Sequence, residues 1–128
     1  MCMCSCHVPV FEFTIPGIVK GTNHGYRIVH YGGRCAIAKL PEIEAWQTEV
    51  AYRTRTARPK GWTPGRRIHI DYKVWFARAG RDADGIVKFL CDGIAAGLGV
   101  NDNAFLAAAL LNEVDKVNPR VEVTIRNG

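Results

Sequence analysis

The sequence predicts a single α+β domain, a mixed β-sheet with two main helices packed on it. Segments in which apolar and polar residues alternate are typical of strands, and they flank two segments with the 3.6-residue apolar period of a helix. The length of 128 residues suits one domain, which buries a core without needing disulfides. We expect residues 1–7 to form a flexible Cys-rich tail and residues 8–128 to form the domain.

The first half of the chain predicts three strands and a helix. Residues 8–15 alternate as a strand does, and Pro16-Gly17 ends that strand. The β-rich segments 26–31 and 34–39 are separated by Gly32-Gly33, which is a hairpin signal. A helix is expected to begin at Pro41 and to end before Pro59, because proline is favoured in the first helical turn.

The second half predicts a strand, a helix and a final strand. Residues 67–77 alternate most clearly, and the polar face of this strand is expected to meet solvent or a ligand. An apolar stripe from Ile86 to Leu98 predicts a helix, which Gly97 and Gly99 should end. Residues 104–117 are ambiguous, since their alanines favour a helix while their boundaries permit a buried strand. Residues 121–125 read as the last strand.

Composition excludes several classes of protein. Apolar residues make up 48% and charged residues 23% of the chain, which is ordinary globular composition and not that of a disordered tail or a coiled coil. The longest uncharged apolar stretch is far shorter than the roughly 20 residues that span a membrane. The N-terminus lacks the features of a secretory signal, so a cytoplasmic location is expected.

The charges are distributed unevenly. The net charge is +5, but between residues 50 and 81 the only acid is Asp71 among many lysines and arginines. Between residues 82 and 102 the balance reverses, with four aspartates against the single cation Lys88. A basic stretch beside a carboxylate cluster suggests a polyanion held next to a metal ion, although a cationic run is often only solvated surface.

The five cysteines do not predict a disulfide framework, because their number is odd and no secretory signal is present. Alternating cysteines followed by a histidine could clamp a soft metal, but a reduced tail is the simpler interpretation. These residues are Cys2, Cys4, Cys6 and His7. The isolated Cys35 and Cys91 are expected to be core residues.

The strongest chemical signal is Asp82-Ala83-Asp84, followed at four-residue steps by Lys88 and Asp92 and later by Asp102. Carboxylates one residue apart can converge on one cation where a loop meets a helix. Each residue also has an ordinary explanation: an N-terminal cap, a surface ion pair, a solvated helix position or a turn. We assign Asp92 to the solvated surface of the helix.

This pattern resembles the RusA family of Holliday-junction resolvases, which are small phage- and prophage-type endonucleases. That family carries an Asp-x-Asp near a helix start, a lysine four residues later and a further Asp after a glycine-containing turn. Here these positions are Asp82, Asp84, Lys88 and Asp102. The segments 13–17 and 119–123 also resemble the ends of the family's domain. A shift of one residue would place Asn103, instead of Asp102, at the last position.

The resemblance implies a RusA-like fold in which residues 104–112 form a strand, and it implies a homodimer. It also implies Mg²⁺-dependent cleavage of four-way or other branched DNA during recombination and repair. Asp82, Asp84 and Asp102 would bind Mg²⁺, and Lys88 would act in catalysis beside them. The dimer contact would come from Phe105, Leu110 and Leu111 or from the preceding helix.

Six cations are candidates for holding DNA phosphates by charge: Lys20, Arg66, Arg67, Lys73, Arg78 and Arg81. Trp62, Tyr72 and Trp75 are weaker candidates for stacking at the junction, since such residues more often pack in the core. Two other functions are considered beside the nuclease. The first is a basic nucleic-acid-binding module without catalysis, and the second is a small metal-binding interaction protein that uses the N-terminal cysteines.

Overall fold

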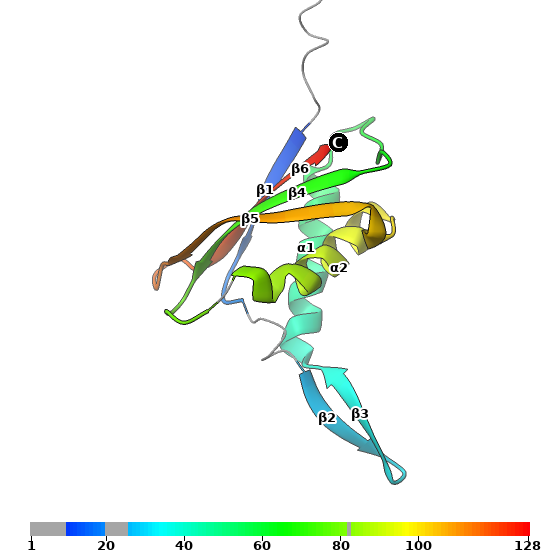
Figure 1. Cartoon of the computed structure of the whole chain (residues 1–128), viewed down its shortest axis with the longest axis vertical. Coiled ribbons are helices and arrows are strands. Elements are labelled where there is room, and N and C mark those ends of the chain that lie inside the picture. The colour runs from blue at the N-terminus through cyan, green and yellow to red at the C-terminus, as the bar shows by residue number, and fades with distance from the viewer. Residues whose placement is uncertain (1–9, 20–25, 82) are drawn as a thin grey trace, which may run out of the picture.

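The computed structural model describes residues 10–19, 26–81 and 83–128. A four-stranded sheet has the order β1-β6-β4-β5, and a separate hairpin is formed by β2 and β3. The predicted tail at residues 1–7, Lys20 and Asp82 lie outside the described residues. The sheet strands are β1 (Val10–Pro16), β4 (Ile68–Phe76), β5 (Phe105–Val114) and β6 (Arg120–Asn127). Figure 1 shows both main helices on one side of this sheet.

The sheet is mixed, as predicted, because β4 pairs antiparallel with β6 but parallel with β5. Side chains alternate along β4, so every second residue from Ile68 to Phe76 is buried against the helices. Buried residues of β6 and β1 continue this core face, for example Ile125 beside Phe11. The opposite face of the sheet, which we call the open face, carries the charged residues of these strands.

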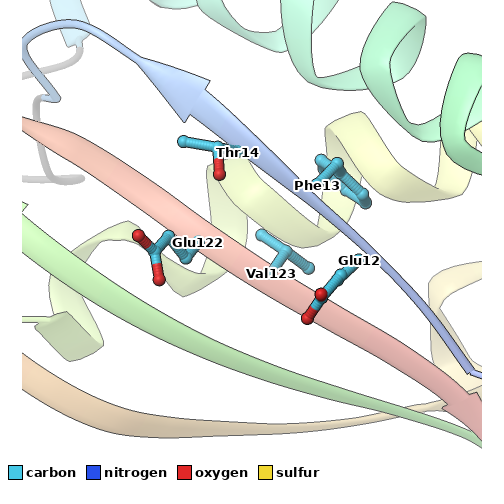
Figure 2. Close-up of a pocket in the computed structure, with 5 residues that line it drawn as sticks. All are labelled: Glu12, Phe13, Thr14, Glu122 and Val123. Atoms are coloured by element: carbon cyan, nitrogen blue, oxygen red, sulfur yellow. The ribbon is translucent and has the colours of Figure 1, made fainter.

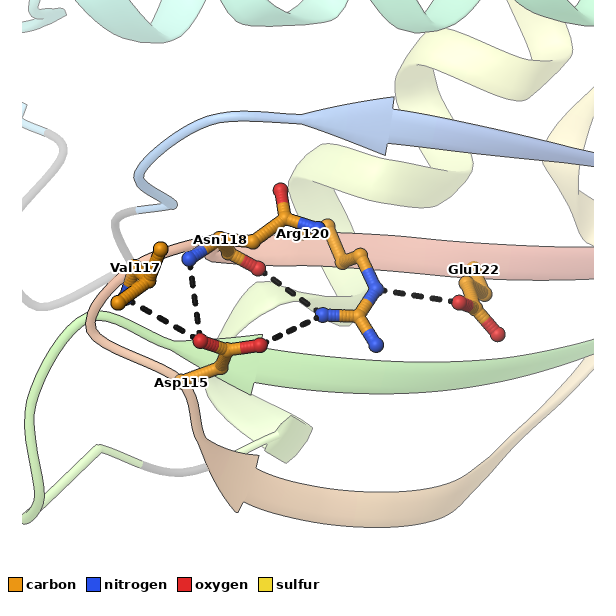
Figure 3. A network of polar contacts seen from close by, with 5 residues as sticks. All are labelled: Asp115, Val117, Asn118, Arg120 and Glu122. Carbon is orange, nitrogen blue, oxygen red and sulfur yellow. Dashed lines mark hydrogen bonds and ion pairs between the residues drawn. The ribbon is translucent and has the colours of Figure 1, made fainter.

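Charges on the open face largely neutralise one another. Arg120 bonds to Glu122 at 3.1 Å and to Asp115 at 3.0 Å, and its guanidinium lies 3.9 Å from the centre of the Trp75 ring. Asp115 also accepts backbone N–H bonds from Val117 and Asn118, which closes the turn between β5 and β6 (Figure 3). These contacts fix the turn without any covalent link.

Helix α1 (Pro41–Ala57) begins at the predicted proline, and α2 (Val87–Leu98) packs beside it. The prediction that Gly97 ends α2 is wrong, because Gly97 is a buried helical residue. A Cβ atom there would lie 2.7 Å from the Ala51 carbonyl oxygen, so glycine is what allows the two helices to approach. The helix ends at Gly99, whose φ of 70° is the left-handed conformation that glycine adopts easily.

The ambiguous segment is a strand, β5, as the family resemblance implied. It is not the buried strand that its boundaries permitted, because it lies at the edge of the sheet and most of its side chains are exposed. Leu106, Leu110 and Val114 are among the exposed large apolar residues. No described residue pairs with the outer edge of this ten-residue strand.

Strands β2 (Tyr26–Tyr31) and β3 (Arg34–Lys39) form the predicted hairpin. Gly32 and Gly33 both have positive φ angles, 51° and 86°, as a two-residue turn of this kind requires. The prediction that Cys35 is a core residue is wrong: it is exposed, and its Sγ lies 3.3 Å from Nδ1 of His30 on the paired strand. Cys91 is buried, as predicted.

Among the described residues, no helix combines the length and the apolar character that crossing a lipid bilayer requires.

Candidate functional site

The short 3₁₀ helix η3 (Ala83–Ile86) leads directly into α2 and carries Asp84, whose side chain is exposed. The residue at the N-cap position of α2 is Ile86, and it makes no side-chain capping bond. Asp84 therefore does not cap α2. Lys88 follows in the first turn of α2 and is also exposed. Within the described ranges, Lys88 forms no ion pair, so Asp84 and Lys88 are not a surface ion pair.

Two strand side chains hold the backbone on either side of residue 82. The Asn112 amide donates to the Arg81 carbonyl at 3.1 Å, and the buried Tyr72 hydroxyl donates to the Ala83 carbonyl at 3.0 Å. Sequence reasoning missed both roles, because no local pattern relates Asn112 to a residue 31 positions earlier. The two bonds anchor the entrance to α2 on β5 and β4.

Asp102 lies in the short helix η4 (Asp102–Ala104), after the chain has reversed at Gly99. Its side chain is exposed, and η4 contacts α2. The Asn101 side chain accepts a bond from the Asn103 N–H at 3.0 Å and so caps η4. The pKa of the Cys91 thiol is raised to about 11, first by burial and then by the negative charges of Asp102 and Asp92. Asp102 is therefore close enough to α2 for its charge to act there.

Asp92 makes a contact with the hairpin. Its carboxylate lies 4.0 Å from the Lys39 ammonium, which also donates to the Gln47 side chain at 3.0 Å. Gln47 in turn donates to the Phe89 carbonyl. Asp92 is thus a partly exposed helix residue that helps to hold the end of β3 against α2, consistent with its assignment to the helix surface.

Four of the predicted phosphate-binding arginines line two surface hollows. Arg66 and Arg67 line one of about 190 Å³ together with Asn103, which is the neighbour of Asp102. Arg78 and Arg81 line another of about 110 Å³ just before the Asp-x-Asp segment. Lys73 lies apart from them, because it is on the open face of the sheet, opposite Glu122 of β6. The structure thus places arginines beside each end of the predicted acidic set.

The three aromatic candidates for stacking have packing roles. Trp62 is buried and meets Phe11 edge to face, with ring centres 5.1 Å apart. Tyr72 is buried and bonded to Ala83, and Trp75 lies beneath Arg120. These residues belong to the core and to the open face, as such aromatic residues most often do.

A further hollow, of about 340 Å³, is lined by strand residues of β1 and β6 (Figure 2). Glu12 and Glu122 contribute its carboxylates, and Phe13, Thr14 and Val123 complete it. None of the residues predicted to carry chemistry lines this hollow. We therefore do not assign the candidate site to it.

The described acids of the predicted set carry oxygen ligands. Mg²⁺ prefers carboxylate oxygens, and Asp84 and Asp102 both present exposed carboxylates. Across the ranges that the structure describes, no three acidic, histidine or cysteine side chains are grouped so that they could hold a metal ion. Asp82, the third acid of the predicted set, lies outside those ranges. The oxygen chemistry of Asp84 and Asp102 thus fits Mg²⁺, and a site of three acids would also require Asp82.

Comparison with known proteins agrees with the resemblance seen in the sequence. No curated protein sequence matches the chain. Residues 27–126 match the family described as endodeoxyribonuclease RusA. This match spans the hairpin, both main helices, β4, β5 and most of β6. The chain therefore belongs to the RusA family of endodeoxyribonucleases.

Proposed function

We propose that this protein is a Mg²⁺-dependent, structure-specific endonuclease that resolves four-way DNA junctions by phosphodiester hydrolysis. The observation that carries the proposal is the exposed pair Asp84 in η3 and Lys88 in the first turn of α2, in a chain whose residues 27–126 match the endodeoxyribonuclease RusA family. In an endodeoxyribonuclease family, an exposed carboxylate and an exposed lysine four residues apart at the start of a helix are best explained by catalysis.

Asp82, Asp84 and Asp102 would hold the Mg²⁺ ion. Such an ion supplies Lewis-acid activation for hydrolysis of a phosphodiester. The Lys88 ammonium stabilises the negative charge that develops on the phosphate or on the leaving oxygen. Arg66, Arg67, Arg78 and Arg81 bind neighbouring phosphates by charge, which orients the DNA without reading its bases.

The proposal includes a homodimer, because a four-way junction presents two strands for symmetric cleavage. The exposed apolar edge strand β5 supports this part of the proposal. Among the described residues nothing pairs with its outer edge, and Leu106 and Leu110 are exposed, which is a common state for a strand that pairs with another chain. Phe105 and Leu111 are half-buried at this strand, whereas Leu110 is exposed.

The decisive experiment separates cleavage from binding. Asp82→Asn and Asp84→Asn keep the side-chain size and remove the charge that would hold the metal. We expect both variants to bind a synthetic four-way junction at least as well as the wild type, measured in Ca²⁺. Single-turnover cleavage in Mg²⁺ should fall by roughly a thousandfold or more, because metal activation is worth several kcal/mol. Lys88→Ala should also cleave slowly.

Asp92→Asn is the matched control, since it makes the same Asp-to-Asn substitution on α2, the helix that follows η3, and should leave cleavage nearly unchanged. If Asp82→Asn and Asp84→Asn fold and still cleave at the wild-type rate, the site is elsewhere. If the wild type binds junctions and never cleaves them, the protein is a DNA-binding module and the nuclease proposal is wrong.

A further inference from the structure

The β2–β3 hairpin extends away from the sheet and the helices, beyond the N-terminal end of α1 (Figure 1). The main contacts of each of its strands are with the other strand. At its base, Lys39 connects it to the body through Gln47 and Asp92. A two-stranded hairpin is marginally stable in water by itself. A partner that binds the hairpin would therefore stabilise it.

The hairpin carries only positive charge. No Asp or Glu occurs between Glu12 and Glu42, although the chain has 12 such residues in all. The hairpin strands contain Arg27, Arg34 and Lys39, with His30 as a further titratable group. Asp92 partly neutralises Lys39 at the base, and Arg27 lies one position further along β2. Arg34 lies next to the turn, so the hairpin carries positive charge from its base to its tip. A second copy of this hairpin would be repelled, whereas a polyanion would be attracted.

The shape of the hairpin favours duplex DNA among polyanions. Gly32 and Gly33 leave the turn without side chains, and the residues next to the turn, Arg34 and Cys35, are exposed. Strands of six residues extend about 20 Å at the usual rise per residue. A two-stranded ribbon of this size fits the major groove of B-form DNA.

We propose that the β2–β3 hairpin is a DNA-binding element that lies in the groove of a duplex arm of the substrate. The proposal rests on the proposed function, because it assumes that branched DNA is the substrate. It assigns the hairpin to the duplex beside the cleavage site, and the exposed Arg34 next to the turn to a phosphate that flanks the groove.

The first test measures salt dependence. The double variant Arg27→Ala/Arg34→Ala should bind a four-way junction roughly tenfold more weakly at 0.1 M salt. The slope of log K against log salt should fall by about one to two units, because binding releases fewer counterions when phosphate contacts are lost. Arg126→Ala, which removes a cation from the open face, is the matched control and should keep the wild-type slope. An unchanged slope in the double variant would overturn the proposal.

The second test uses Cys35 as a natural reporter near the turn. Its thiol is exposed, while Cys91 is buried and serves as an internal reference. Alkylation by N-ethylmaleimide, followed by peptide mapping, should be several-fold slower at Cys35 when junction DNA is bound. An unchanged rate with DNA bound would overturn the proposal. Protection that depends on protein concentration without DNA would assign the hairpin to contact between copies and would also overturn it.

The two proposals fail in different ways. Loss of the nuclease proposal would appear as cleavage by the Asp84→Asn variant or as binding without cleavage by the wild type. Loss of the hairpin proposal would appear as normal Mg²⁺-dependent cleavage with an unchanged salt slope in the double variant.

Discussion

Two side chains from neighbouring strands hold the peptide carbonyls of Arg81 and Ala83, the residues on either side of Asp82. A carboxylate that binds a metal must be held within a fraction of an ångström of its working position, so fixing the backbone beside it matters for the rate. Asn112 can be removed without opening the core, because it is exposed on the edge strand, whereas Tyr72 is buried.

We expect Asn112→Ala to slow single-turnover cleavage by roughly ten- to a hundredfold, since misplacement of a catalytic group has effects of this size. Junction affinity should stay near that of the wild type, because no phosphate contact is lost. A Mg²⁺ titration of the cleavage rate should show a weaker apparent affinity for the ion. Glu113→Ala, at the next position of β5, is the control. Equal losses of binding and cleavage would show that Asn112 is not a positioning residue.

At the scale of elements, the close approach of α1 and α2 depends on glycine. A Cβ atom at Gly97 would lie 2.7 Å from the Ala51 carbonyl oxygen and 2.9 Å from the Thr54 Cβ. Alanine is favoured over glycine inside a helix by about 1 kcal/mol, but here the backbone of α1 occupies the space. Overpacking of this kind typically costs about 1–3 kcal/mol.

Gly97→Ala is therefore expected to lower the free energy of unfolding despite its better helix propensity. Urea denaturation should show a lower midpoint for this variant. Ala96→Ser, at the neighbouring exposed position of the same helix, should change the midpoint very little. A more stable Gly97→Ala variant would mean that the two helices separate at little cost.

The turn between β5 and β6 makes stability depend on pH. The pKa of Asp115 is lowered from 3.8, chiefly by the Asn118 N–H and further by Arg120 and the Val117 N–H. A carboxyl group whose pKa is lower in the folded state stabilises the fold above its unfolded pKa, and that contribution is lost as the pH falls through the folded pKa.

We expect Asp115→Asn to be less stable than the wild type at neutral pH and to converge with it below pH 3.8. Thermal unfolding across the acid range would measure this difference. Glu113→Gln, a neighbouring exposed acid on β5, should show no such convergence. A constant difference between Asp115→Asn and the wild type at every pH would mean that packing, and not ionisation, explains the loss.

For the whole molecule, the alternation of side chains was enough to predict β1, β4 and β6, because each of these strands has one face on the core. The sequence of β5 did not determine whether this segment is a strand or a helix. Their alanines favour a helix, and only parallel pairing with β4 makes them a strand. Such pairing joins residues far apart in the chain, so no local pattern contains it.

The candidate site was predictable in its residue types but not in its supports. The spacing of Asp84 and Lys88 is local, and it placed both at the beginning of α2. The hydrogen bonds from Asn112 and Tyr72 depend on how β5 and β4 pack near η3, and no local sequence pattern predicts that packing. Cys35 was expected in the core because cysteine is commonly buried. It is exposed because its hairpin extends away from the sheet.

At the scale of the whole molecule, the outer edge of β5 has no pairing partner within the part of the chain that the structure describes. An edge strand offers a row of free N–H and C=O groups, and natural proteins usually protect it with charges or proline. In β5 the only charged residue is Glu113, while Leu106 and Leu110 remain 42% and 58% exposed. A second copy that adds its own β5 antiparallel would satisfy both edges at once through a two-fold contact.

We therefore expect the wild-type chain to be a dimer in sedimentation equilibrium and the double variant Leu106→Lys/Leu110→Lys to be a monomer. Burying two lysines beside their symmetry-related copies would cost desolvation and charge repulsion. Val117→Lys is the control, because Val117 is 95% exposed in the turn that follows β5. The monomeric variant should lose the paired incisions that resolve a junction while staying folded by circular dichroism. A wild-type monomer, or a double variant that remains a dimer, would show that β5 is not the contact between copies.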